Sequence, residues 1–217
     1  MSRLPLLPDR ERPLVFAHRG CSSLTPENTF ASFRKAREVG APGLELDVHL
    51  TREGELVVAH DDNFLRTSPN AAAGARPIEE ITRSEISGID VGSFFDPAFA
   101  AERCPRLVDV LEEFCPDLYV DIELKTRKIT GDALPRMTAG LLALLGSAVC
   151  ASVTVSSFNP FALAAFKKAA QSRGGAVARV PTAVIYHVDQ EVPWVLRRGA
   201  GRFLAAADYV KPHHSLA

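Results

Sequence analysis

Residues 43–61 read GLELDVHLTREGELVVAHD, and this stretch decides the fold. Short runs rich in apolar and β-branched residues flank a polar segment, so both runs are predicted to be β-strands. About five residues connect them, whereas parallel neighbouring strands need a crossover of about a dozen. The two strands are therefore predicted to be antiparallel. Folding them about Glu53-Gly54 places Asp47 opposite His60.

Similar apolar runs recur along the chain, with helical patterns between most of them. Besides 43–51 and 56–61, the predicted strands are 14–20, 117–125, 152–159, 181–187 and 208–212. The predicted helices are 26–39, 107–114, 132–145 and 160–171, the first with start signals at Thr25 and Asn28. Alternation of strand and helix predicts an α/β fold with a parallel sheet.

Residues 62–105 differ in character from this alternating pattern. A short helix is expected at 78–89, and Phe94, Phe95 and Phe99 are expected to form a local core around Pro97. The segment does not resemble a sheet-building unit. We therefore predict one domain over 1–217 with a small insertion at about 62–105.

Composition limits the classes of function. Hydrophobic residues make up 47% of the chain and charged residues 24%, and the net charge of -1 gives no global attraction to nucleic acid or an anionic membrane. The four cysteines include no C-x-x-C pair, which argues against a zinc knuckle or redox motif. No apolar stretch is long enough to span a bilayer, and no segment resembles a secretory leader. We expect a cytoplasmic protein with reduced thiols and no nucleic-acid partner.

Acidic and basic residues lie inside two of the predicted strands. Alternation places Glu45 and Asp47 on one face of their strand, and Asp121, Glu123 and Lys125 share a face of a later strand. Unpaired buried carboxylates are costly, so they need a partner such as a cation. The oxygens of Glu45, Asp47 and Glu123 form a hard ligand set suited to Mg²⁺ or Ca²⁺.

Two histidines end predicted strands in a similar way. His18 and His60 can serve as proton donor and acceptor near neutral pH. Arg19 and Lys125 can hold phosphate oxygens. An ordinary alternative is that these two cations form salt bridges with the strand carboxylates in the absence of a metal.

Other polar residues near these positions have simpler expected roles. Glu27 and Asn28 are interpreted as a first-turn carboxylate and a helix cap. Asp61 is expected to orient a histidine. Surface or loop positions are expected for the histidines without motif support, which are His187, His213 and His214.

The order and spacing of these residues resemble a known family. The sequence contains, in order, His18-Arg19-Gly20, Pro26-Glu27-Asn28-Thr29, Glu45-Leu46-Asp47, Thr51, Gly54, His60-Asp61, Glu123-Leu124-Lys125 and Ser157-Phe158-Asn159. This set resembles the glycerophosphodiester phosphodiesterase family. The resemblance implies a distorted (β/α)₈ TIM-type barrel that hydrolyses glycerophosphodiesters to an alcohol and glycerol 3-phosphate.

The resemblance also implies roles for individual residues. Glu45, Asp47 and Glu123 would bind one divalent ion, Mg²⁺ or Ca²⁺, His18 and His60 would be the acid–base pair, and Arg19 and Lys125 would contact the phosphate. Related activities stay open, namely a lysophospholipase D or a phosphoinositide-type phosphodiesterase. An inactive, truncated binding module is the alternative from a different class.

The resemblance is incomplete toward the C-terminus. Family members normally continue with a strand of the W-T-V-N kind and a last strand carrying Asp-Pro, and neither motif is present. A (β/α)₈ barrel takes about 250 residues, whereas the predicted strands supply only six barrel positions. We therefore expect a barrel truncated by about two strands, whose open edges can associate with another chain.

Overall fold

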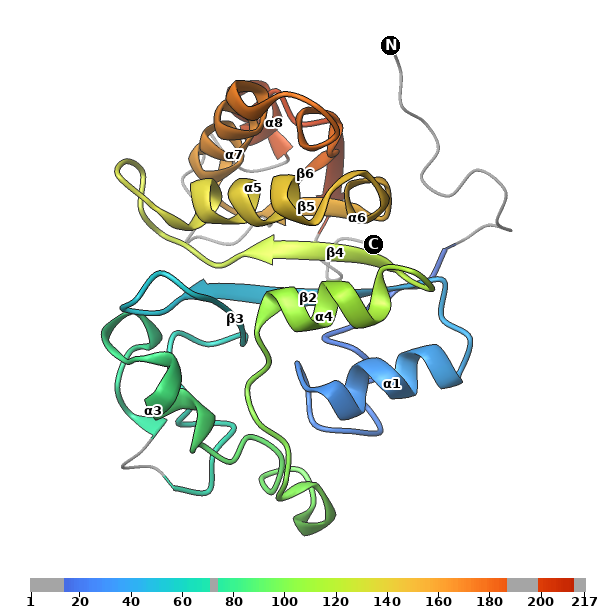
Figure 1. The fold of residues 1–217 in the computed structure, drawn as a ribbon, viewed down its shortest axis with the longest axis vertical. Helices are drawn as coiled ribbons and strands as arrows, with labels where there is room; N and C mark the ends of the chain where they lie inside the picture. The colour runs from blue at the N-terminus through green and yellow to red at the C-terminus, as the bar shows by residue number, and fades with distance from the viewer. Residues whose placement is uncertain (1–13, 71–73, 187–198, 213–217) are drawn as a thin grey trace.

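The computed structural model describes residues 14–70, 74–186 and 199–212. Strands and helices alternate along most of the chain (Figure 1). The strands are β1 (Ala17–His18), β2 (Gly43–Leu50), β3 (Leu56–Val58), β4 (Tyr119–Leu124), β5 (Val153–Ser157), β6 (Thr182–Tyr186) and β7 (Tyr209–Pro212). Each predicted strand is confirmed, with shorter bounds than expected.

The helices follow the predicted pattern less uniformly. They are α1 (Phe30–Glu38), α3 (Arg83–Ser87), α4 (Leu107–Phe114), α5 (Leu134–Leu145), α6 (Ser147–Ala151), α7 (Pro160–Arg173) and α8 (Gly201–Ala205), with 3-10 turns η1 (Ile78–Glu80), η2 (Pro97–Phe99) and η3 (Val177–Arg179). The single helix predicted at 78–89 is wrong, because extended backbone at Ile81 separates η1 from α3. No helix in these described ranges has the length and apolar character to cross a membrane.

The start of α1 also differs from the prediction. Thr29, and not Thr25 or Asn28, caps the helix: its hydroxyl accepts the Ser32 N–H at 3.3 Å, and the Ser32 hydroxyl accepts the Thr29 N–H at 3.3 Å. Asn28 has a left-handed φ of 55°, which helical backbone excludes. The segment before Thr29 is therefore a turn, and this turn brings Asn28 to the sheet.

The sheet has the topology expected of a TIM-type barrel. Its order is β1-β2-β4-β5-β6-β7 with every neighbouring pair parallel, and β3 pairs antiparallel with β2 off this path. Lys211 Nζ on β7 lies 2.7 Å from Asp121 Oδ2 on β4, although two strands separate them in the sheet. The sheet is therefore curled, and the α/β barrel class is confirmed as a partial barrel of six parallel strands over the described residues.

The pairing of β2 with β3 corrects the predicted register by one residue. Val48 lies opposite Val58, and the Ala59 N–H donates to the Asp47 carbonyl oxygen at 3.0 Å, so Asp47 does not face His60. The cause is the turn, because the Thr51 N–H donates to the Glu55 carbonyl oxygen at 2.9 Å and closes a three-residue loop instead of a two-residue one. Gly54 has a φ of +84°, the left-handed conformation that glycine adopts without strain in such loops.

The main core lies between the outer face of the sheet and the helices. It includes strand residues Leu44, Leu46, Val48, Val120, Ile122, Leu124, Val153 and Val155 and helix residues Phe33, Leu111, Phe114, Leu142, Leu163 and Phe166. Burying each such side chain contributes about 1.5–3 kcal/mol. Because side chains alternate along a strand, this packing directs the polar residues of β2 and β4 to the opposite, inner face.

Segment 62–105 contributes no strand to the sheet among its described residues. It packs its own apolar cluster, formed by Val57, Ala59, Phe64, Ile78, Ile81, Ile86, Ile89, Val91 and Cys104. Phe94, Phe95 and Phe99 do contact one another edge to face, but they lie outside this cluster and Phe95 is 40% exposed. The predicted phenylalanine core is therefore wrong, because these rings sit on the exposed turn around η2. Figure 1 shows the segment (turquoise to green) below the sheet, on the side away from α5 and α7.

Candidate active site

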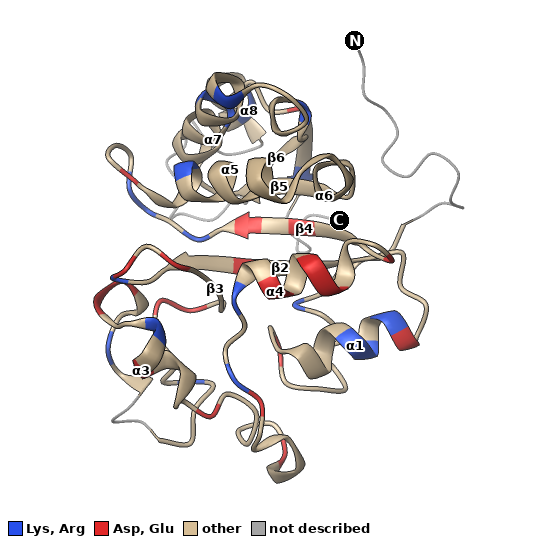
Figure 2. Ribbon diagram, viewed as in Figure 1, with Lys and Arg blue, Asp and Glu red and all other residues tan. Residues whose placement is uncertain are grey.

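The candidate site lies at the carboxyl ends of β1, β2 and β4, the edge at which barrel enzymes carry their chemistry. In the parallel register Glu45 lies beside Asp121, and Asp47 lies beside Glu123. Figure 2 shows these acidic residues as red bands on neighbouring strands. The alternation in the sequence therefore produces a double row of carboxylates on the inner face.

Three of these carboxylates converge. One oxygen each from Glu45, Asp47 and Glu123 lies within 4.8 Å of the others, and all three residues are buried. Burial, followed by the charge of Asp47, raises the pKa of Glu45 well above its ordinary value. Burial also raises the pKa of Glu123, against the opposing charge of Lys125. Glu45 Oε1 is buried and has no hydrogen-bond partner among the residues that the structure describes. This oxygen cluster can hold a metal ion.

The predicted cations lie against the same carboxylates. Arg19 Nε is 3.3 Å from Asp47 Oδ2, and Lys125 Nζ is 3.4 Å from Asp47 Oδ1 and 3.0 Å from Glu123 Oε1. The backbone N–H of Arg19 donates to Glu45 Oε2 at 3.0 Å. The salt bridges proposed as an alternative to a metal are thus present for Asp47 and Glu123, whereas Glu45 has no such cationic side chain from Arg19 or Lys125.

Lys211 is a charged residue of this face that the sequence analysis missed. Its ammonium donates to Asp121 Oδ2 at 2.7 Å, and its charge also acts on Glu45 and Glu123. Burial opposes the charged form, but these carboxylates outweigh it and raise the pKa of Lys211. Glu45 was identified because it is a charged residue inside a predicted strand. Lys211 is also a charged residue inside a predicted strand, so the same criterion could have identified it. Among the described residues, the side chains of Arg19, Lys125 and Lys211 form salt bridges with Asp47, Glu123 and Asp121, and none of these three cations forms one with Glu45.

Of the two predicted histidines, His18 lies next to the carboxylates, and His60 is close enough for its charge to act on His18. His18 Nε2 lies 3.8 Å from Glu45 Oε2, and 67% of the His18 side chain is exposed. Partial burial of His18 lowers its pKa, and the positive charge of Arg19 lowers it further. His60 Nδ1 lies 2.7 Å from Asp61 Oδ1, so the predicted contact of Asp61 with a histidine is present. A carboxylate partner requires a proton on Nδ1 and leaves Nε2 for proton exchange.

Asn28 has a different position from the one its sequence context suggested. Its Nδ2 donates to Asp47 Oδ2 at 2.9 Å, and the Asp47 N–H donates to Asn28 Oδ1 at 3.4 Å. Asn28 therefore orients a candidate metal ligand instead of capping α1. The sequence could have indicated this role, because Thr29 of the Pro-Glu-Asn-Thr motif can cap α1 and leaves the Asn28 side chain available for another contact.

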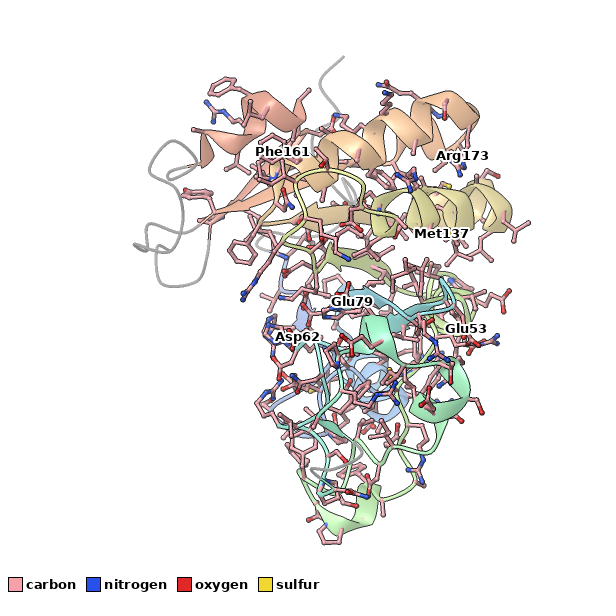
Figure 3. All side chains as sticks on the ribbon, turned by 90° about the vertical axis from the view of Figure 1, so that its left-hand side faces the viewer. Glu53, Asp62, Glu79, Met137, Phe161 and Arg173 are labelled. Carbon is pink, nitrogen blue, oxygen red and sulfur yellow. The ribbon has the colours of Figure 1, made fainter. Side chains whose placement is uncertain are left out.

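Of the other histidines, only His49 lies in the described part of the chain. Its Nε2 contacts the carbonyl oxygen of His60, just after β3, at 3.1 Å. His187, His213 and His214 lie outside the described residues. Figure 3 looks onto this end of the sheet, with Asp62 after β3 and Phe161 in α7 on opposite sides of it.

Comparison with known proteins identifies the family of this chain. Residues 18–215 match the glycerophosphoryl diester phosphodiesterase family. This chain belongs to that family. A glycerophosphodiester phosphodiesterase of Caldanaerobacter subterraneus subsp. tengcongensis is 39% identical over 73% of this chain and 63% of its own length. One from Bacillus subtilis is 33% identical over 62% of this chain and 46% of its own. The chain thus spans less than two thirds of the length of these curated relatives.

Solved structures of the glycerophosphodiester phosphodiesterase family share the fold. A phosphodiesterase of Oleispira antarctica, in complex with the product sn-glycerol-3-phosphate, superposes with a TM-score of 0.72 over 94% of this chain and 76% of its own, at 24% identity. A glycerophosphodiester phosphodiesterase of Agrobacterium tumefaciens gives a TM-score of 0.63 over 90% and 94%, also at 24% identity. At these identities the likeness establishes the fold alone.

Proposed function

We propose that this chain is a metal-dependent phosphodiesterase that hydrolyses glycerophosphodiesters to an alcohol and glycerol 3-phosphate. The observation that carries the proposal is the convergence of Glu45, Asp47 and Glu123 within 4.8 Å, with His18 Nε2 3.8 Å from Glu45 Oε2. His60 is close enough for its charge to act on His18. Membership of the family supports the reaction class. The Oleispira antarctica protein, which has the same fold, holds sn-glycerol-3-phosphate as its product.

The residues present fit one divalent cation. Glu45, Asp47 and Glu123 offer oxygen ligands, which both Mg²⁺ and Ca²⁺ prefer. Within the described part of the chain, Glu45 Oε1 is a buried acceptor without a hydrogen-bond partner, and Arg19, Lys125 and Lys211 form no salt bridge with Glu45. A bound cation would supply positive charge to offset the negative charge that develops on the phosphate oxygens.

The side chains around the carboxylates account for the other steps. Arg19 and Lys125, each less than one fifth exposed, are proposed to bind the phosphate oxygens at the edge of the site. One histidine of the pair removes a proton from the nucleophile, which is a water or a neighbouring hydroxyl of the substrate. The other histidine protonates the leaving alkoxide. Asp61 fixes the ring of His60 so that Nε2 is the nitrogen that exchanges the proton.

The test is hydrolysis of glycerophosphocholine and bis(p-nitrophenyl) phosphate with Mg²⁺, Ca²⁺ or EDTA. We expect turnover that EDTA abolishes and that falls by about 10²–10⁴-fold in His18→Ala and in His60→Ala. Lys168→Met, at an exposed position of α7, is the control and should retain full activity. Turnover that persists in EDTA, or a fully active His60→Ala protein, would overturn the proposal.

The same assay separates the related functions. Turnover of lysophosphatidylcholine or phosphatidylinositol, without turnover of glycerophosphocholine, would indicate a phosphodiesterase for another head group. Absence of any turnover, together with Mg²⁺-dependent binding of glycerol 3-phosphate by calorimetry, would indicate a binding module.

A further inference from the structure

An arginine of segment 62–105 connects two walls of the candidate site. Arg66 Nη1 and Nη2 donate to the two oxygens of Glu27 at 2.8 and 2.6 Å, and Arg66 Nε donates to Asp61 Oδ2 at 2.8 Å. Each carboxylate in turn contacts a residue of the proposed machinery. Asp61 Oδ1 lies 2.7 Å from His60 Nδ1, and Glu27 Oε1 accepts from Arg19 Nη1 at 3.0 Å.

We infer that Arg66 is a positioning residue of the proposed reaction, which fixes His60 through Asp61 and Arg19 through Glu27. This inference rests on the proposed function, because it assigns His60 to proton transfer and Arg19 to phosphate binding. Arg66 itself touches neither the carboxylate cluster nor the histidines in the described contacts. Its effect is therefore on the geometry of the groups that do.

The chemistry of the guanidinium suits this double contact. Its five N–H donors form a rigid planar fork, so one side chain binds both oxygens of Glu27 and an oxygen of Asp61 together. A lysine ammonium is a single point charge and cannot reproduce this geometry. The fork thus sets the distance between the turn before α1 and the end of β3.

The ionisation of the two carboxylates agrees with this arrangement. Burial would raise the pKa of Glu27, but hydrogen bonds from Arg66 and the charge of Arg19 lower it below its ordinary value. Burial likewise opposes ionisation of Asp61, and its hydrogen bonds to His60 and Arg66 outweigh that effect on its pKa. Both groups stay ionised near neutral pH, so Asp61 remains an acceptor for His60 Nδ1.

Global stability is not the main role of Arg66. Its side chain is 46% exposed, and ion pairs of exposed side chains typically contribute little to the free energy of unfolding. Arg76 of the same segment provides a matched comparison, because it is 49% exposed and donates to Glu85 Oε1 at 2.6 Å and to the Glu80 carbonyl oxygen at 2.9 Å. Neither partner of Arg76 contacts His60 or Arg19 in the described structure.

The first experiment compares Arg66→Met with Arg76→Met by kinetics on bis(p-nitrophenyl) phosphate. We expect kcat to fall about 10–100-fold in Arg66→Met, because loss of a residue that orients a catalytic group typically has that effect. KM should rise as well, since Arg19 loses its support, while the melting temperatures of the two variants stay alike. Arg66→Lys should recover little of kcat. Ethylguanidinium, but not ethylammonium, should partly rescue Arg66→Ala.

A second measurement does not depend on turnover. Imidazole ¹⁵N spectra, with the His60 signals identified from their loss in His60→Gln, report whether Nδ1 carries the proton. We expect a single Nδ1–H form in the wild-type protein and in Arg76→Met, and a mixture of tautomers in Arg66→Met. A wild-type protein that hydrolyses no diester, with this spectral change intact, would remove the proposed function and leave the positioning role. Wild-type kinetics and spectra in Arg66→Met would overturn the inference itself.

Discussion

At the scale of single residues, Asp47 is held from three directions. It is 1% exposed and contacts Asn28, Arg19 and Lys125. Arg19 and Asn28 both have left-handed backbones, with φ of 53° and 55°. Such conformations are uncommon outside glycine, and asparagine tolerates them better than most residues. An asparagine at position 28 thus tolerates the left-handed backbone of the turn and also donates a hydrogen bond to the Asp47 carboxylate.

This arrangement predicts the effect of Asn28→Gly. Glycine accepts the left-handed φ without strain, so the change removes the hydrogen bonds to Asp47 and leaves the backbone unstrained. We expect the affinity for Mg²⁺, measured by titration calorimetry, to fall about 10–100-fold. Asn63→Ala, which removes only local hydrogen bonds to Asp62 Oδ1 and from the Leu65 N–H, should bind Mg²⁺ as the wild type does. Equal affinities in all three proteins would contradict an orienting role for Asn28.

At the scale of elements, Asp208 joins three of them at the opposite end of the sheet. Asp208 Oδ2 accepts the Thr182 N–H at 2.9 Å and the Thr182 hydroxyl at 3.0 Å, and lies 3.2 Å from Lys167 Nζ. These contacts connect the residue before β7 to the start of β6 and to α7. Burial would raise the pKa of Asp208, but the Thr182 N–H and the charge of Lys167 outweigh it and lower the pKa.

The lowered pKa predicts a pH-dependent contribution to stability. Because the folded pKa lies below the unfolded value of about 3.9, the contribution is complete above that value and is lost as the pH falls through the folded pKa. We expect Asp208→Asn to lower the free energy of unfolding by about 1 kcal/mol at neutral pH, with the difference disappearing in acid. Urea denaturation at a series of pH values measures this. The control is Asp117→Asn, because the Asp117 carboxylate is 57% exposed and its loss should change the free energy of unfolding little. If the effect of Asp208→Asn did not depend on pH, the negative charge of Asp208 would not be its cause.

At the scale of the whole molecule, the ion pair of Lys211 with Asp121 crosses the curled sheet. It connects β7 to β4 although β5 and β6 lie between them. Asp121 is buried, and in residues 14–70, 74–186 and 199–212 its Oδ1 has no hydrogen-bond partner. Loss of the lysine would therefore leave a buried carboxylate without its counter-ion.

We expect Lys211→Met to lower the free energy of unfolding by about 2 kcal/mol, as for a lost hydrogen bond to a charged group. The value is less than for a fully buried pair, because the Lys211 side chain is 38% exposed. Urea denaturation in EDTA measures it without interference from a metal. Lys168→Met provides the control at an exposed lysine. If both variants unfold at the same urea concentration, the pair does not hold the curled sheet.

Two predictions at this scale remain predictions. One is the single domain over 1–217 with an insertion at 62–105, and the other is association of the sheet edges with another chain. In the described sheet β1 and β7 are the terminal strands. Strands at the ends of a sheet offer unpaired backbone groups, which is the physical basis of the second prediction.

The sequence by itself determined the features that depend on local periodicity. Alternation within Leu44–Val48 and within Val120–Lys125 fixed which carboxylates share a face, and the spacing of the motifs placed His18 and His60 at strand ends. The parallel sheet followed from the alternation of strand and helix, and the antiparallel β2–β3 pair followed from the short connection between them. These features are settled within one strand or one connection, so no distant contact is needed to predict them.

Only the tertiary structure decided the features that join distant positions. Asn28 meets Asp47 from 19 residues away, Arg66 meets Glu27 from 39, and Lys211 meets Asp121 from 90. The β2–β3 register likewise depended on one extra residue in the turn at Gly54, which periodicity leaves open. Contacts of this kind are set by how turns and the curl of the sheet bring elements together. A local sequence pattern does not indicate which distant residues come into contact.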